Sequence, residues 1–141
     1  MLSAQWYNMK KILKEIAERE LIGIKAGNGN HRFLPIWMVV VEDQIYARSW
    51  GQKKGWYRAF QEEGVGEVSA RSGQYRVKAE FIDEDDKINE WVDKAYEQKY
   101  NKASYQKYVD DLQTSSSRST TVRLVLQEEW NIWIQRKTLI H

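Results

Sequence analysis

The chain of 141 residues contains no cysteine and only two histidines, His31 and His141. The absence of cysteine excludes disulfide bridges, thiolate metal ligands and thiol nucleophiles together, and it is typical of a protein kept in a reducing compartment. His31 falls in a predicted turn and His141 is the last residue, so neither is placed as the base of a nucleophilic triad. These absences argue against a hydrolase of the triad type.

Long apolar runs are missing as well. No stretch approaches the ~18 consecutive apolar residues of a membrane-spanning helix, and the first residues lack the apolar core of a signal peptide. We therefore expect a cytoplasmic protein. The formal net charge is +2, from 22 basic and 20 acidic side chains, so the overall charge does not favour nucleic acid and any basic patch must be local.

Carboxylates do not form a catalytic pattern either. The acidic pairs at 42–43 and 62–63 are sequence neighbours, and such pairs usually diverge or face solvent. The acidic run 83–86 stands at the start of a predicted helix, where negative charge complements the helix dipole. No spaced set of histidines and carboxylates predicts a metal site. We therefore predict no metal and assign no catalytic residue.

Aromatic residues are abundant, with seven Trp and eight Tyr. Their large amphipathic rings fill cores, interfaces and planar-ligand sites alike, so their number alone does not select a function. The chain length favours one domain, which we place at residues 1–127. Residues 128–141 form an apolar tail, which we expect to pack on the same chain or on a partner subunit.

Hydrophobic periodicity predicts an α+β domain whose first half is rich in strands. Residues 36–41 are apolar at consecutive positions, so we expect both faces of this strand to be covered, as in a barrel or a sandwich. The expected elements are a helix over 4–19, a strand over 21–26, a turn at 27–30, a strand over 35–41, a turn at 42–44 and a strand over 45–49.

The second half is predicted to alternate helices with a hairpin and a last strand. The expected elements are a helix over 56–63, a hairpin of strands 65–70 and 74–82, a helix from 83 to about 100, a helical piece over 104–112 and a strand over 121–127. Alternation places Phe81 inward, and helical spacing places Trp91 in a buried stripe. The Ser-rich segment 114–120 is predicted to be a loop and the best candidate for a mobile segment.

The loop over residues 48–58 has the composition of a ligand site. It combines four cations, a hydroxyl, glycines and aromatic rings. Arginine grips phosphate with two parallel donors, lysine adds a point charge, and an indole offers a stacking face. Gly55 before a helix would aim main-chain N–H groups at the same anion. Neither a Walker loop nor a dinucleotide-binding fingerprint is present, and a solvated basic loop whose aromatic residues join the core explains the composition equally well.

Five segments carry a resemblance to a family of small bacterial proteins, domain-of-unknown-function family 2255. They are Pro-Ile-Trp-Met-Val-Val-Val-Glu-Asp-Gln-Ile-Tyr-Ala-Arg-Ser at 35–49, Gly-Trp-Tyr-Arg at 55–58, Asp-Lys-Ala-Tyr at 93–96 with Lys-Tyr at 99–100, and Thr-Val-Arg-Leu at 121–124. The resemblance extends from about residue 15 to 127. The family that the chain resembles is grouped with the FMN-binding split β-barrels, the superfamily of pyridoxamine-phosphate oxidases and deazaflavin-dependent reductases, many of which are homodimers.

The resemblance implies a split β-barrel of about six mostly antiparallel strands, with an N-terminal helix and two helices before the last strand. It also implies a homodimer that binds FMN or a deazaflavin, and it suggests an oxidoreductase. By motif position, the residues implied to grip the phosphate are Arg48, Ser49, Lys53, Lys54 and Arg58, and those implied to line the ring are Trp37, Trp50, Trp56 and Tyr57. For Trp37 alone, core packing is the common alternative.

Two other functions stay open. The first is a non-enzymatic interaction or small-ligand-binding module that has lost the cofactor, since fold does not determine function. The second is the binding of single-stranded nucleic acid, because bases can stack on Trp and phosphates can pair with Lys. The nearly balanced charge makes nucleic acid the least favoured partner.

Overall fold

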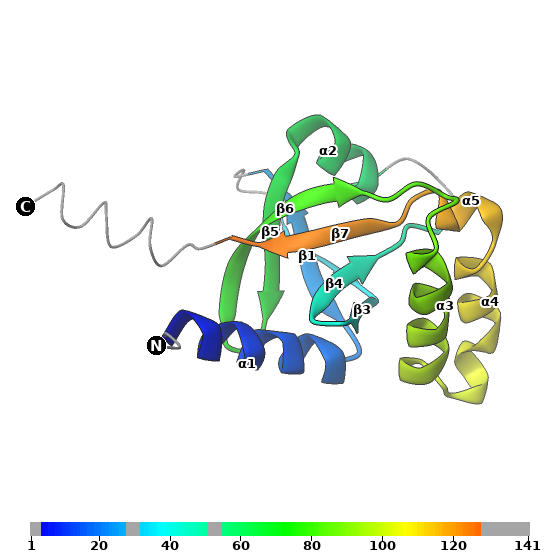
Figure 1. Cartoon of the computed structure of the whole chain (residues 1–141), viewed down its shortest axis with the longest axis horizontal. Helices are drawn as coiled ribbons and strands as arrows, with labels where there is room; N and C mark the ends of the chain where they lie inside the picture. Colours follow the sequence, from blue (N-terminus) through cyan, green and yellow to red (C-terminus); the bar gives the residue numbers. More distant parts are fainter. Residues whose placement is uncertain (1–3, 28–31, 51–54, 128–141) are drawn as a thin grey trace, which may run out of the picture.

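The computed structural model describes residues 4–27, 32–50 and 55–127 (Figure 1). Lys53 and Lys54 and the whole tail from residue 128 lie outside the described residues. The strands are β1 (Ile22–Ala26), β2 (Leu34–Ile36), β3 (Met38–Val41), β4 (Gln44–Ala47), β5 (Val65–Ala70), β6 (Gly73–Phe81) and β7 (Val122–Leu126). The helices are α1 (Ala4–Glu18), α2 (Trp56–Glu63), α3 (Ile88–Lys99), α4 (Gln106–Leu112) and α5 (Ser115–Arg118), with a 3-10 turn over Ala103–Tyr105.

The seven strands form one antiparallel sheet in the order β2-β1-β5-β6-β7-β4-β3. The two edge strands are consecutive pieces of the same chain segment, separated only by Trp37. β2 pairs with β1 and β3 pairs with β4, so the segment 34–41 links the two edges and nearly closes the sheet into a barrel. The prediction of an α+β barrel is therefore confirmed, and the count is seven because one expected strand is broken at Trp37.

The barrel interior is apolar, and α1 contributes to it. Ile12, Leu13 and Ile16 of α1 pack with inward residues of the strands such as Met38 and Leu124. Figure 1 shows α1 across one end of the barrel and α2 at the opposite end. Each such side chain contributes about 1.5–3 kcal/mol by leaving water, which explains why a chain without disulfides can keep this barrel folded.

A second apolar cluster lies outside the barrel, where α3 and α4 cover β3 and β4. The barrel contributes Trp37, Val39 and Tyr46, and the helices contribute side chains that include Tyr96 and Leu112. Met38, by contrast, belongs to the barrel interior and is fully buried. The expectation that both faces of the apolar strand are covered is thus confirmed, with a helix layer on one face and the barrel core on the other.

Three expectations from the second half of the chain are wrong. The segment 114–120 is not an open loop, because α5 forms there and Ser117 and Thr120 are fully buried. Phe81 ends β6 with 43% of its surface exposed and packs against Tyr57. Trp91 is 56% exposed on α3, with Lys94 Nζ 5.1 Å from its ring centre. The hydrophobic periodicity did not predict which side of α3 is buried against the barrel and which side is exposed.

Among the described residues, no helix is both long and apolar enough to cross a membrane.

Candidate functional site

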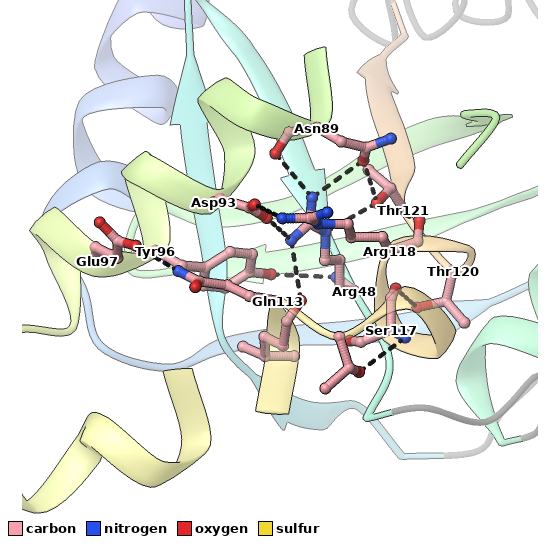
Figure 2. A network of polar contacts seen from close by, with 12 residues as sticks. Arg48, Asn89, Asp93, Tyr96, Glu97, Gln113, Ser117, Arg118, Thr120 and Thr121 are labelled. Carbon is pink, nitrogen blue, oxygen red and sulfur yellow. Dashed lines mark hydrogen bonds and ion pairs between the residues drawn. The ribbon is translucent and has the colours of Figure 1, made fainter. Parts of the chain in front are cut away.

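Arg48 follows β4 and has only 2% of its surface exposed. Its Nε donates to Thr121 Oγ1 at 2.8 Å, and its Nη1 donates to Asp93 Oδ1 at 2.5 Å and to the Leu112 main-chain oxygen at 3.0 Å (Figure 2). Its Nη2 donates to the main-chain oxygen and to Oδ1 of Asn89, at 3.1 and 3.0 Å. The side chain therefore connects the end of β4 with α3, α4 and the start of β7.

A guanidinium has five N–H groups, and these five hydrogen bonds engage all of them. The prediction that Arg48 grips a cofactor phosphate does not fit this geometry, because an anion would have to displace acceptors that are already in place. A buried charge is tolerated when it is paired and hydrogen-bonded. Arg48 meets both conditions, so its role in this structure is to fasten the helices to the barrel.

Asp93 on α3 joins two arginines. One carboxylate oxygen accepts from Arg48 and the other accepts from Nη2 of Arg118, whose side chain is 39% exposed. The cation on α5 is thereby tied to the same buried carboxylate (Figure 2). Two positive charges around one carboxylate leave a net positive charge at the point where β4, α3 and α5 meet.

Ser49 is held by the segment that was expected to be a loop. Its main-chain N–H donates to Thr120 Oγ1 at 2.9 Å, and its carbonyl accepts from Ser117 Oγ at 2.7 Å. The main-chain N–H of Arg48 donates to the Tyr96 hydroxyl at 3.1 Å, and burial raises the pKa of that hydroxyl. The strand end that was predicted to face a ligand is therefore fixed on several sides by protein groups.

Trp37 and Trp50 do come together, and they do so with tyrosines of the helix layer. Trp37 stacks on Tyr100, with ring centres 4.0 Å apart and an angle of 7° between the planes. Trp50 lies 5.6 Å from Trp37 and 6.4 Å from Tyr108, and Trp37 lies 6.3 Å from Tyr108, all at steep angles. We name Trp37, Trp50 and Tyr108 the aromatic cluster.

The aromatic cluster is part core and part surface. Trp37 is 9% exposed, whereas Trp50 is 43% and Tyr108 is 50% exposed. Each such ring pair contributes about 0.5–1.5 kcal/mol beyond the area that it buries. The half-exposed rings of Trp50 and Tyr108 each leave part of an apolar face accessible to a planar molecule beside buried Trp37. Trp50 directly precedes the part of the loop that lies outside the described residues.

The remaining predicted residues lie apart, on α2. Trp56 packs against Phe60 and the barrel core. Tyr57 is buried, its hydroxyl donates to the Ser119 main-chain oxygen at 3.4 Å, and burial raises the pKa of that hydroxyl. The Arg58 side chain is 69% exposed and pairs with Glu62 of the same helix. Trp56 and Tyr57 thus behave as core residues, while Arg58 stays available to an anion.

Sequence reasoning missed the residues that surround the predicted ones. Asn89, Asp93 and Thr121 hold Arg48, and Tyr108 completes the aromatic cluster. The spacing of Tyr105 and Tyr108 was visible as a helical stripe, but nothing in it pointed to Trp50. In the part of the chain that the structure describes, no group of three or more His, Cys, Asp or Glu gathers in a way that could hold a metal ion.

Comparisons with known proteins add one positive finding. Neither a search of curated proteins nor a search of solved structures returned a match. A family model does match, over residues 12–124. The match includes every described strand except the last two residues of β7, and it begins within α1, so that residues 4–11 lie outside it. The chain therefore belongs to the family described as "Uncharacterized protein conserved in bacteria (DUF2255)".

Proposed function

We propose that this protein binds a flavin or a deazaflavin in the manner of the FMN-binding split β-barrels, with the planar ring against the aromatic cluster. The observation that supports this proposal most is the pairing of half-exposed Trp50 and Tyr108 with buried Trp37 at the break between β2 and β3. The Trp37 ring is held by its stack on Tyr100, so the surface is formed in advance of binding. Ligand sites are commonly apolar, aromatic and largely pre-formed.

The described residues fit the ring of such a cofactor better than its phosphate. Arg48 has no donor to offer, which leaves Arg58, 69% exposed, as the described cation among those predicted for the phosphate. Lys53 and Lys54 keep their predicted phosphate role, and variants of these two residues test it. A bound flavin supplies hydride chemistry, and the protein contributes binding and exclusion of water. We assign no catalytic residue, so an oxidoreductase activity stays part of the proposal.

The proposal is tested by titrating the purified protein with FMN and following the quenching of flavin fluorescence. We expect Trp50→Leu to weaken binding by about tenfold or more, because a stacked ring is worth about 1–3 kcal/mol. Trp91→Leu is the matched control, since Trp91 is also half-exposed but lies outside the aromatic cluster. Equal affinity of the wild type and Trp50→Leu would overturn the placement of the ring.

A second candidate is a non-enzymatic interaction module without a cofactor. The hydrogen bonds of Arg48 favour it, because a residue that was predicted to grip the phosphate has all its donors engaged by the protein instead. In this case the exposed rings of Trp50 and Tyr108 contact a protein partner. Lys53→Ala combined with Lys54→Ala would then weaken that protein contact and leave small-molecule binding unchanged, whereas the flavin proposal expects weaker FMN binding.

We further propose that two copies associate, as the resemblance to split barrels implies. Light scattering that gives twice the mass of the 141-residue chain supports this, and a monomer mass at micromolar concentration contradicts it.

A further inference from the structure

We propose that a groove between α1, β3 and α3 binds a short aliphatic monocarboxylate, with Lys99 as the cation that receives its carboxylate. This groove is separate from the aromatic cluster and does not depend on the proposed flavin. Its volume is about 330 Å³, which is at the lower end of small-molecule sites. The residues that line it are Ala17, Glu18, Val39, Val40, Ala95, Gln98 and Lys99.

Lys99 is held in place by main-chain carbonyls. Its Nζ donates to the Ile16 oxygen in the last turn of α1 at 2.7 Å and to the Met38 oxygen at 2.5 Å. An ammonium group has three N–H donors, so one remains for a further acceptor, and the nearest ring, that of Tyr100, has its centre 4.9 Å from Nζ. The two carbonyls fix the position of the cation, and a fixed cation recognises a ligand at lower entropic cost than a mobile surface lysine.

The charge of Lys99 has no counterion among the described residues. Each ion pair found in that part of the chain involves another cation, and the acceptors of Lys99 are neutral carbonyls. Burial lowers the pKa of Lys99 to about 8, which reflects the cost of keeping an unpaired ammonium in a partly desolvated position. A carboxylate in the groove would supply both the missing acceptor and the missing negative charge.

The rest of the lining narrows the ligand class. The small apolar side chains of Ala17, Val40 and Ala95 suit a short aliphatic body, although polar atoms make up the larger part of the lining. Glu18 also lines the groove and repels any anion, an effect that grows with the charge of the ligand and therefore disfavours dicarboxylates and phosphates more than a monocarboxylate bound on the Lys99 side. A single carboxylate on a short aliphatic chain therefore matches the groove best.

Titration of the full chain with sodium hexanoate, followed by amide chemical shifts in nuclear magnetic resonance spectra, tests the proposal. We expect saturable shifts in α1, β3 and α3 with a Kd on the order of a millimolar, as suits a ligand of few atoms. Hexanol and hexylammonium are the matched ligands without the carboxylate. Shifts of the same size with hexanol would overturn the role of the charge.

Two variants and a control separate binding from folding. Lys99→Met is expected to weaken hexanoate binding about tenfold or more, and Lys94→Met, on the same helix but outside the groove lining, is expected to leave it unchanged. Ala95→Leu fills the groove and leaves Lys99 intact, so it decides the question if Lys99→Met does not fold. Unchanged affinity in Ala95→Leu, or in a folded Lys99→Met, would refute the site.

Discussion

A guanidinium shielded from water is stable only where each donor meets an acceptor, and Arg48 meets this condition with five hydrogen bonds. In the sequence it looked like a ligand for an external anion, since arginine beside a Gly-rich and Lys-rich loop is common in phosphate sites. The same chemistry, namely planar donors that suit oxygen acceptors, serves the interior when the acceptors belong to the protein. In the folded protein, the Arg48 guanidinium that was predicted to bind a ligand therefore binds protein acceptors instead.

Loss of the Arg48 guanidinium should therefore lower the stability of the protein. We predict that Arg48→Met lowers the free energy of unfolding by about 3–5 kcal/mol, because it leaves buried acceptors and part of a buried carboxylate without a partner. Urea denaturation measures the change. Arg58→Met is the matched control, since the Arg58 side chain is 69% exposed and its helical ion pair with Glu62 contributes little. A loss under 1 kcal/mol for Arg48→Met would show that the network is not stabilising.

Lys99 and two tyrosines give stability a specific dependence on pH. Burial lowers the pKa of Lys99 from 10.5 to about 8, so between these values the unfolded chain binds more protons than the folded chain, and stability rises with pH. Burial raises the pKa of Tyr96 and of Tyr100 above their ordinary value of 10.0. Above pH 10 the unfolded tyrosines therefore lose protons that the folded chain retains, and stability falls.

Urea denaturation of the wild type and of Lys99→Met from pH 7 to 11 tests this profile. We expect the wild type to gain stability from about pH 8 to 10 relative to the variant, because the variant has no ammonium at this position. Glu18 lines the same groove, and the Tyr100 ring lies 4.9 Å from Lys99 Nζ, so both face the titrating group. A constant difference between the two proteins across this range would contradict the assigned burial effect.

Helix α5 is only four residues long, but it leads directly into the polar network around Arg48. Its four residues and the two that follow position Thr121, whose Oγ1 accepts from Arg48 Nε and lies 2.8 Å from Asn89 Oδ1. We predict that Thr121→Val, which conserves the shape of the side chain, costs about 1–3 kcal/mol because a charged donor in the interior loses its acceptor. Thermal unfolding compared with Ser116→Ala, an exposed position on α5, measures this cost. Equal melting temperatures would contradict it.

The turn between β3 and β4 holds a local strain that a single replacement should relieve. Glu42 and Asp43 have φ angles of 48° and 63°, in the left-handed region that asparagine tolerates better than glutamate. We predict that Glu42→Asn raises the free energy of unfolding by up to about 1 kcal/mol. The same replacement at Glu62 in α2 should lower it, because asparagine is a poorer helix former. A loss of stability in Glu42→Asn would argue against strain at this turn.

For the molecule as a whole, periodicity predicted most of the elements, and long-range pairing explains what it missed. The helix over Trp56–Glu63 and the strand over Val65–Ala70 lie where the patterns put them, because local spacing and glycine positions determine both. The break at Trp37 and the acceptors of Arg48 depend on segments up to 73 residues away, which a local pattern does not contain. The Ser-rich segment looked solvated because the group that its buried hydroxyls bind, the main-chain oxygen of Ser49, lies 68 to 71 residues away in the sequence.

The candidate site was predicted only in part for the same reason. Trp37 and Trp50 lie next to each other, Tyr108 joins them from α4, and Trp56 and Tyr57 pack inward on α2. The barrel and the aromatic cluster support a planar ligand, whereas the phosphate part of the prediction rests on Lys53, Lys54 and Arg58. We therefore keep the binding of a flavin or deazaflavin to this barrel as our main proposal.

One spectrum tests that claim most directly. The full chain is purified from cells, and its absorption is recorded before and after it is denatured to release any bound cofactor. We expect a flavin or deazaflavin band at blue or near-violet wavelengths, with the released chromophore in a fixed ratio to protein. A colourless protein that also fails to quench added FMN at micromolar concentration would contradict the account.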